Sequence, residues 1–395
     1  MVLRRKINNM SVYLDYQSSK PVDPRVVEAM TPYLSSKFGN PSSLHSLGNE
    51  ATKILENARQ TVAGFINAEK DEIIFTSGAT ESNNLGIIGF AMRNKQRGNH
   101  IIISEIEHIS IHNIAKYLAK NEFDISKVPV DQYGKVSVNK IKDRLTDNTI
   151  LISIGYANNE IGTIQPIAEI GNLCREKNII LHSDAVAAEG LLPIDVKKDN
   201  IDILTFSSND IYGPKGVGVL YVRKGIRLTP LMIGGGQESG IRSGTENIPG
   251  IVGMAKAVEI MQQEMDNEIK KLRGYRDHLI KIILRKIPKS YLNGHPTERL
   301  ANNAHFRFSG IEGESLLLSM NDKGISVSTG SACSSKTLEP SHTLISLGLL
   351  HEEAHGSLQF TFGRFTSQRD IDAAAEALPD VVNRLRKLSP LYHKT

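Results

Sequence analysis

The chain has 395 residues, of which 40% are hydrophobic and 23% charged, and its formal net charge is +4. This length indicates two structural units, and the small charge gives no reason to expect nucleic acid or a membrane surface as a partner. No apolar run is long enough to span a bilayer, and the basic N-terminal stretch lacks the apolar segment of a signal peptide. The only two cysteines, Cys174 and Cys333, are too few for a disulfide framework, so the expected location is the reducing cytoplasm.

Short β-rich runs alternate with helix-length segments through the first two-thirds of the chain, a pattern typical of βαβ units and a mostly parallel sheet. The predicted strands are residues 73–76, 101–103, 149–154, 179–182 and 203–206. Periodicity predicts helices over 167–177, 250–285 and 367–388. Two further predicted strands, 302–307 and 357–362, belong to a smaller unit.

Polar residues follow the predicted strands at their carboxyl ends. They occupy positions 77–80, 105–108, 158–160, 184 and 207–210. Ligands in open α/β sheets bind at this edge, so we expect the five clusters to line a single pocket.

One cluster, Ser77-Gly78-Ala79-Thr80, ends a strand and opens a helix. The free N–H groups of a helix N-terminus bind phosphate. The alternative is an ordinary helix cap formed by Ser77 or Thr80. The pattern alone does not choose between them.

Cys333 lies among small polar residues, Gly330-Ser331-Ala332-Cys333-Ser334. This context predicts an exposed thiol on a mobile loop, whose thiolate could act as a nucleophile or a metal ligand. The alternative is a buried small hydrophobe, which we predict instead for Cys174 on the apolar face of its helix. The glycine-rich stretch 234–245 permits close backbone approach or is a plain surface loop.

Together these motifs resemble the cysteine desulfurases of the NifS/IscS type, which are pyridoxal-phosphate (PLP) proteins of the class-V aminotransferase family. The resemblance covers essentially the whole chain through stretches 13–16, 38–43, 76–83, 158–162, 211–216, 242–245 and 330–334. It implies an α/β fold of type I, with a large PLP domain over 20–262 and a small α/β domain over 1–19 and 263–395. It also implies a homodimer.

The resemblance assigns roles by motif position. Ala79, Thr80, Ser207 and Asn209 are expected at the PLP phosphate, and Thr245 at the phosphate of the neighbouring subunit. Asp184 is expected at the ring nitrogen, Asn159 near the ring hydroxyl, and His108 stacked on the ring as a catalytic group. Cys333 is the position that receives sulfur as a persulfide.

The chain departs from the family pattern at four positions. Asp210 stands where the family has its Schiff-base lysine, and Asn209 where it has a phosphate-binding histidine. Ala187 replaces a glutamine, and Gln359 an arginine that binds the substrate carboxylate. A carboxylate cannot form the covalent link to PLP, and its ordinary pKa of about 3.9 suits proton transfer poorly. We therefore expect PLP to bind non-covalently, with weak or absent desulfurase activity.

Three functions compete. In the first, the protein serves iron–sulfur cluster assembly with an IscU-type scaffold, and Cys333 accepts sulfur from another donor or supplies one ligand to a nascent 2Fe–2S cluster. In the second, it is an active desulfurase that converts L-cysteine to L-alanine and a persulfide on Cys333, using unlinked PLP with Lys20 or Lys215 as the base. The third, a PLP enzyme for another substrate, is disfavoured by the motif around Cys333.

Overall fold

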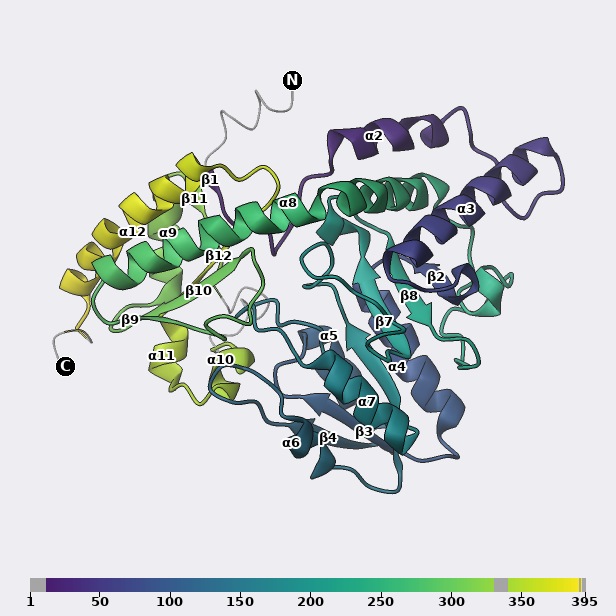
Figure 1. Cartoon of the computed structure of the whole chain (residues 1–395), viewed down its shortest axis with the longest axis horizontal. Helices are drawn as coiled ribbons and strands as arrows, with labels where there is room; N and C mark the ends of the chain where they lie inside the picture. The colour runs from purple at the N-terminus through teal and green to yellow at the C-terminus, as the bar shows by residue number, and fades with distance from the viewer. Residues whose placement is uncertain (1–11, 330–339, 391, 393–395) are drawn as a thin grey trace.

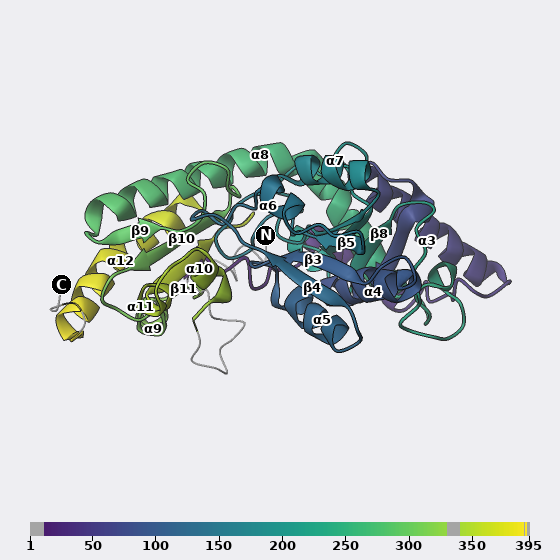
Figure 2. The same ribbon diagram turned by 90° about the horizontal axis from the view of Figure 1, so that it is seen from below.

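The computed structural model describes residues 12–329, 340–390 and 392. A large sheet with its helices and a smaller sheet with its own helices lie side by side (Figure 1). The 39-residue helix α8 (Ile248–Lys286) runs along both of them (Figure 2).

The large sheet has seven strands and is mostly parallel, as predicted. Only β8 runs antiparallel to its two neighbours, β2 and β7. The spatial order is β2 (Ile73–Thr76), β8 (Gly218–Val222), β7 (Ile203–Ser207), β6 (Ile180–Asp184), β5 (Thr149–Ser153), β3 (His100–Ser104) and β4 (Asp124–Val128).

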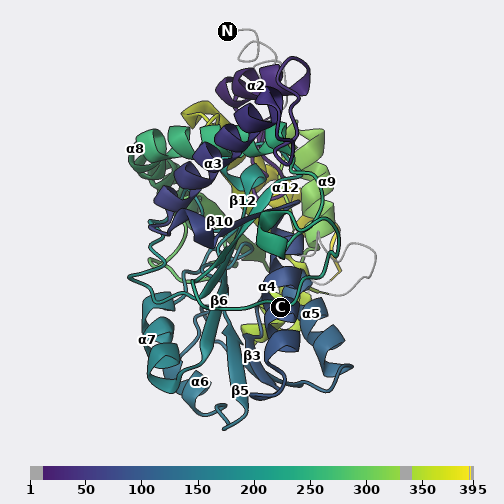
Figure 3. The ribbon, with the colours of Figure 1, turned by 90° about the vertical axis from the view of Figure 1, so that its right-hand side faces the viewer.

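Helices cover both faces of this sheet, which explains why its strands are continuous apolar runs. Ile101 and Ile103 of β3 pack in the core beneath α4 (Ala79–Asn94) and α5 (Ile109–Ala119), whereas Ile102 between them packs in the opposite core. That opposite core includes residues of α3 (Ser46–Phe65), α7 (Ile167–Lys177) and α8. Figure 3 shows α7 and α5 on opposite sides of the sheet.

The smaller sheet is antiparallel, in the order β12 (Ser357–Thr361), β10 (Asn303–Phe308) and β9 (Ser290–Leu292). A two-stranded parallel ladder of β1 (Val12–Tyr13) and β11 (Ile325–Ser326) lies close to it, because Asp15 bridges to Thr361 of β12. The helices of this part are α9 (Gly313–Asp322), α10 (His342–Ser346), α11 (His351–His355) and α12 (Gln368–Leu388).

Short elements complete the chain. They are α2 (Pro24–Met30), α6 (Val138–Lys142), η1 (Thr31–Leu34), η2 (Lys70–Glu72), η3 (Ser208–Ile211) and η4 (Glu238–Gly240). The expected domain boundary at residue 262 falls inside the continuous helix α8, and the division into two domains stays a prediction. No helix in the described part of the chain is both long and apolar enough to cross a membrane.

Candidate cofactor site

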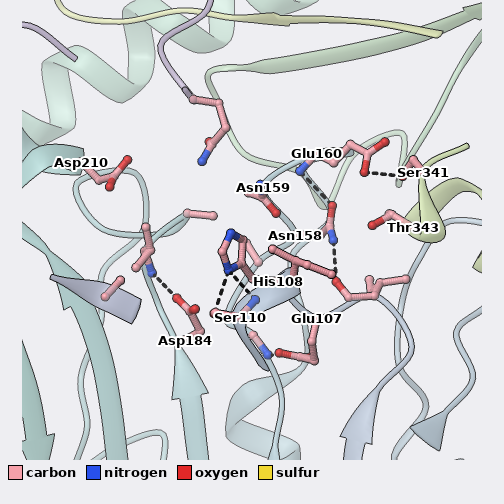
Figure 4. A pocket seen from close by; sticks show the side chains of 18 of the residues that line it. Glu107, His108, Ser110, Asn158, Asn159, Glu160, Asp184, Asp210, Ser341 and Thr343 are labelled. Atoms are coloured by element: carbon pink, nitrogen blue, oxygen red, sulfur yellow. Dashed lines mark hydrogen bonds between the residues drawn. The ribbon is translucent and has the colours of Figure 1, made fainter. Parts of the chain in front are cut away.

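A cavity of about 350 Å³ opens at the carboxyl ends of the parallel strands (Figure 4). All five polar clusters contribute to its wall, so the predicted convergence on one pocket is confirmed. The smaller sheet and its neighbouring segments supply Ser328, Ser341, His342 and Gln359. Of the predicted site residues, the wall contains Ala79, Thr80, His108, Asn159, Asp184, Asn209 and Asp210.

The N-terminus of α4 forms one end of the pocket. Gly78 precedes it with a φ of 151°, and no side chain caps the helix, so the alternative of a Ser77 or Thr80 cap is wrong. A Cβ on Gly218 of β8 would lie only 2.5 Å from the Cα of Gly78, so the strand needs glycine at position 218 to approach this turn closely. Ala79 and Thr80 follow in the wall, and the uncapped helix end suits a phosphate.

Asp184 ends β6 with its carboxylate fixed from two directions. Its Oδ2 accepts a hydrogen bond from Asn83 Nδ2 at 2.8 Å, and its Oδ1 accepts one from the backbone N–H of Val186 at 3.0 Å. Asn83 Oδ1 is buried without a partner among the described residues. The carboxylate is therefore oriented before any ligand binds, as a partner for a protonated ring nitrogen requires.

His108 precedes α5 and is tied to its first turn. Its Nδ1 hydrogen bonds the Ser110 hydroxyl at 2.8 Å and accepts the Ser110 N–H at 3.2 Å. The ring itself is exposed within the wall of the pocket (Figure 4). A planar ring held in this way can stack on an aromatic ligand.

Gln359 uses its side-chain amide to fasten a neighbouring loop. Its Nε2 donates to the backbone oxygens of Asn159 at 2.7 Å and Glu160 at 2.9 Å. An amide has two N–H donors, so neither remains for a substrate carboxylate.

Asp210 lies in the pocket wall on η3, and its side chain is almost fully buried. The Lys20 ammonium donates to the backbone oxygen of Asp210 and lies 4.0 Å from its Oδ1. Burial raises the pKa of Asp210, and the opposing effect of Lys20 does not reverse this. The carboxyl is therefore easier to protonate than an ordinary aspartate.

Two further buried carboxyl groups line the pocket. Burial raises the pKa of Glu107 and of Glu160 to about 7. Glu107 accepts from the Gly155 N–H at 3.0 Å, and Glu160 accepts from the Ser341 hydroxyl at 2.6 Å. No lysine or arginine appears among the wall residues that the structure describes.

Several predicted residues lie elsewhere. Ser207 is buried next to the pocket but outside its wall, and Thr245 and Lys215 are exposed. Cys333 lies outside the described residues. Cys174 is buried on α7, as predicted, and burial raises the pKa of its thiol to about 12. Within the described ranges, no group of three His, Cys, Asp or Glu residues could hold a metal ion.

Comparison with known proteins agrees with this geometry. The family model for class-V aminotransferases matches residues 12–374. A cysteine desulfurase IscS of Archaeoglobus fulgidus is 55% identical over 97% of this chain and 100% of its own length. One from Methanosarcina thermophila is 50% identical over 98% and 95%.

Solved structures show the same likeness. A NifS-like protein superposes with a TM-score of 0.89 at 34% identity, over 95% of this chain and 100% of its own. A NifS-like protein from Rickettsia africae gives 0.85 at 31% identity, over 94% and 99%. The chain therefore belongs to the class-V aminotransferase family and, within it, to the cysteine desulfurases of the IscS and NifS type. The expected PLP fold of type I is confirmed, and PLP is the cofactor expected of such a protein.

The residues present fit PLP in all but one respect. The uncapped end of α4 suits the phosphate, the fixed carboxylate of Asp184 suits the ring nitrogen, and the ring of His108 can stack. What the described wall lacks is a lysine to bind PLP covalently.

The sequence did not single out Asn83, His342 or the buried Glu189. Asn83 lies one helical turn after the Ser77–Thr80 turn that opens α4, and this position is the only local indication that its side chain could reach the pocket. Glu189 is an isolated charge in the small-residue stretch Ala187-Ala188-Glu189-Gly190, and that contrast could have drawn attention to it.

Proposed function

We propose that this protein acts in iron–sulfur cluster assembly, where it handles sulfur or a nascent 2Fe–2S cluster through Cys333 with little or no desulfurase activity of its own. One observation carries the proposal. The pocket presents a buried carboxyl at position 210, five residues before Lys215, and its described wall contains no lysine. Position 210 is where we infer that relatives have their Schiff-base lysine.

The remaining wall residues support non-covalent binding of PLP. The end of α4 would hold the phosphate, Asp184 the ring nitrogen and His108 the ring face, with Asn159 near the ring hydroxyl. Ser207 and Asn209 would add contacts on the phosphate side, and Thr245 would act in the partner subunit of a homodimer. Bound PLP would supply the electron sink for reactions at the substrate α-carbon.

Substrate binding is weakened as well. Both amide hydrogens of Gln359 are donated to backbone oxygens. Gln359 therefore cannot bind a substrate carboxylate as an arginine would, through charge-assisted hydrogen bonds worth about 1.5–3 kcal/mol. Asp210 adds a carboxyl beside an incoming amino acid. L-cysteine would therefore bind poorly, and sulfur would come from another donor.

We assign the acceptor as an IscU-type scaffold protein in the cytoplasm. The relatives named above are cysteine desulfurases, and the motif 330–334 with Cys333 is retained in this chain. Through Cys333 the protein would pass on a sulfur atom or contribute one thiolate ligand to a cluster shared with the scaffold.

One assay tests the proposal. Pure protein is incubated with PLP and L-cysteine, and alanine and sulfide are measured. A second incubation adds scaffold, ferrous iron and sulfide, and records cluster formation with the parent and with Cys333→Ala. We expect no turnover together with Cys333-dependent cluster formation. Robust alanine production that is lost in Cys333→Ala would reject the proposal in favour of an active desulfurase.

The variant Asp210→Lys tests the assignment of position 210. We expect it to retain PLP through dialysis and to yield a PLP–lysine adduct at residue 210 after borohydride reduction. The parent is expected to lose PLP on dialysis and to give no adduct. A variant that forms no adduct would show that position 210 does not face the cofactor aldehyde.

One observation favours the alternative of an active desulfurase that uses unlinked PLP. Lys20, one of the two candidate bases, is buried with its ammonium 4.0 Å from Asp210, whereas Lys215 is exposed and outside the wall. If turnover is found, Lys20→Ala should abolish it and Lys215→Ala should not.

A further inference from the structure

A second cavity, of about 360 Å³, shares no wall residue with the cofactor pocket. Its wall is built by the segments that follow β5 and β6, by the middle of α8, and by the loop between β9 and β10. Apart from four charged side chains and the hydroxyl of Thr297, the wall is apolar and includes Leu191 and Leu192. The cavity therefore combines charge with an apolar surface, as pockets for small organic ligands do.

Three of the four charged side chains are guanidinium groups. Arg273 and Arg276 lie three positions apart on α8, so they share one face of the helix. Arg299 precedes β10, and its backbone oxygen accepts a hydrogen bond from Arg276 Nη1 at 3.1 Å. The fourth group is the carboxylate of Asp277, which is also on α8. Two distant segments thus bring their arginines to the same cavity.

Arg299 is a buried cation without a counter-ion among the described residues. It is only 4% exposed, and it forms no ion pair with a described carboxylate. Burial, followed by the charge of Arg276, lowers the pKa of Arg299 to about 9, as expected for such a cation. Its N–H groups donate only to neutral oxygens, those of the backbone of Ile161, Asn293, His295 and Asn303 and of the Asn303 side chain.

The other two guanidinium groups keep donors for a ligand. Arg276 donates from Nε and Nη2 to Asp277 at 2.8 and 2.7 Å, and from Nη1 to the backbone oxygens of Arg299 and Leu300. A guanidinium has five N–H groups, so one on Nη2 has no partner among the described residues. Arg273 is exposed and forms no hydrogen bond or ion pair with a described residue. Both donors are therefore available to an anion that enters the cavity.

The charge of the wall indicates the class of anion. Three guanidinium groups and one carboxylate leave a net charge of +2. Glu298, next to Arg299 in the chain, lies outside the wall and pairs with Lys135 at 2.5 Å. A phosphate monoester carries a charge of about −1.5 to −2 at pH 7, whereas a carboxylate carries one negative charge. The planar guanidinium fork also matches the spacing of phosphate oxygens.

We propose that this cavity is a binding site for a small phosphate monoester with an apolar substituent. The phosphate accepts hydrogen bonds from Arg273 and from Nη2 of Arg276, and the buried charge of Arg299 stabilises it. The substituent packs against Leu191 and Leu192. Neither PLP nor Cys333 takes part, so this site does not depend on the proposed function.

Calorimetric titration of the full chain with phenyl phosphate, in a chloride buffer, tests the site. Arg273→Gln should weaken binding about ten- to hundredfold, because it removes charge-assisted hydrogen bonds. Asp277→Asn should strengthen binding about threefold or more, because it removes the carboxylate that competes for Arg276. Arg285→Gln, a matched change of an exposed arginine on the same helix outside the wall, should have no effect.

Two outcomes of the titration would overturn the proposal in whole or in part. An affinity that Arg273→Gln and Asp277→Asn leave unchanged, or that Arg285→Gln lowers equally, would show that the cavity does not bind the probe. Tighter binding of benzoate than of phenyl phosphate would reject phosphate as the ligand class.

A crystal soaked in tungstate, a tetrahedral dianion, locates the site directly, since the end of α4 can take the same kind of anion. We expect anomalous density between Arg273 and Arg276. Density at the end of α4 alone would support the cofactor pocket and reject the second site.

Discussion

Replacing Glu160 with glutamine should remove a pH-dependent loss of stability. Glu160 lies in the pocket wall with 7% of its surface exposed, and burial raises its pKa from 4.5 to about 7. Since one pKa unit corresponds to about 1.4 kcal/mol, the folded state favours the acid form by about 3 kcal/mol. Glutamine is uncharged and keeps a side-chain oxygen that can accept from the Ser341 hydroxyl.

The sign follows from proton binding. Between about pH 4.5 and pH 7 the unfolded chain releases this proton while the folded chain keeps it, so the parent loses stability as pH rises through this window. The free energy of unfolding of Glu160→Gln, relative to the parent, should therefore increase by about 3 kcal/mol from about pH 4 to about pH 8. Urea unfolding followed by circular dichroism measures both proteins across the series.

The exposed Glu176 on α7 offers the matched control. Glu176→Gln should leave the pH dependence as in the parent, because water solvates this carboxylate in both states. A difference between Glu160→Gln and the parent that stays constant across pH would show that the Glu160 carboxyl is not held in its acid form by burial.

Three further changes probe the frame of the site. Arg59→Ala should lower the free energy of unfolding by about 3–5 kcal/mol, which chemical denaturation measures. Arg59 binds the buried Glu238 carboxylate through two hydrogen bonds of 2.8 Å, so the substitution leaves a buried charge without its partner. Gly218→Ala should weaken PLP binding in equilibrium dialysis without a loss of helix content, because the new Cβ would meet Gly78 at 2.5 Å. Asp184→Asn should raise the PLP dissociation constant about ten- to hundredfold, because it removes one charge-assisted hydrogen bond to the ring nitrogen. An unchanged dissociation constant would show that Asp184 does not bind the ring nitrogen.

The sequence predicted the regular elements where burial imposes a period. The helix over 167–177 matches α7 at both ends, and the five apolar runs became β2, β3, β5, β6 and β7. The edge strand β4 escaped notice because only one of its residues is buried and its sequence carries no apolar run. β8 was missed although it is buried, because the adjacent stretch 211–216 was used only as a family motif and the apolar run after it was not considered as a strand.

The site was predictable to the extent that it follows strand ends. Parallel strands bring their carboxyl ends to one edge whatever the details of packing, so the five clusters met as expected. Asn83 bonds Asp184 from 101 positions away in the chain, and no local pattern reports such a pairing. The raised pKa of Asp210 was beyond the sequence for the same reason, because it depends on burial by distant segments, an effect that Lys20, 190 residues earlier, opposes without reversing.

The groups that support the pocket do not depend on the side chain at position 210. Asp184 is held by Asn83 and a backbone N–H, and His108 by Ser110; neither contact involves residue 210. Lys20 bonds the backbone oxygen of Asp210, which any residue at this position provides. A change at 210 is therefore expected to alter charge and chemistry while leaving the geometry of the other groups in place, which is why Asp210→Lys is a fair test of what a lysine would do there.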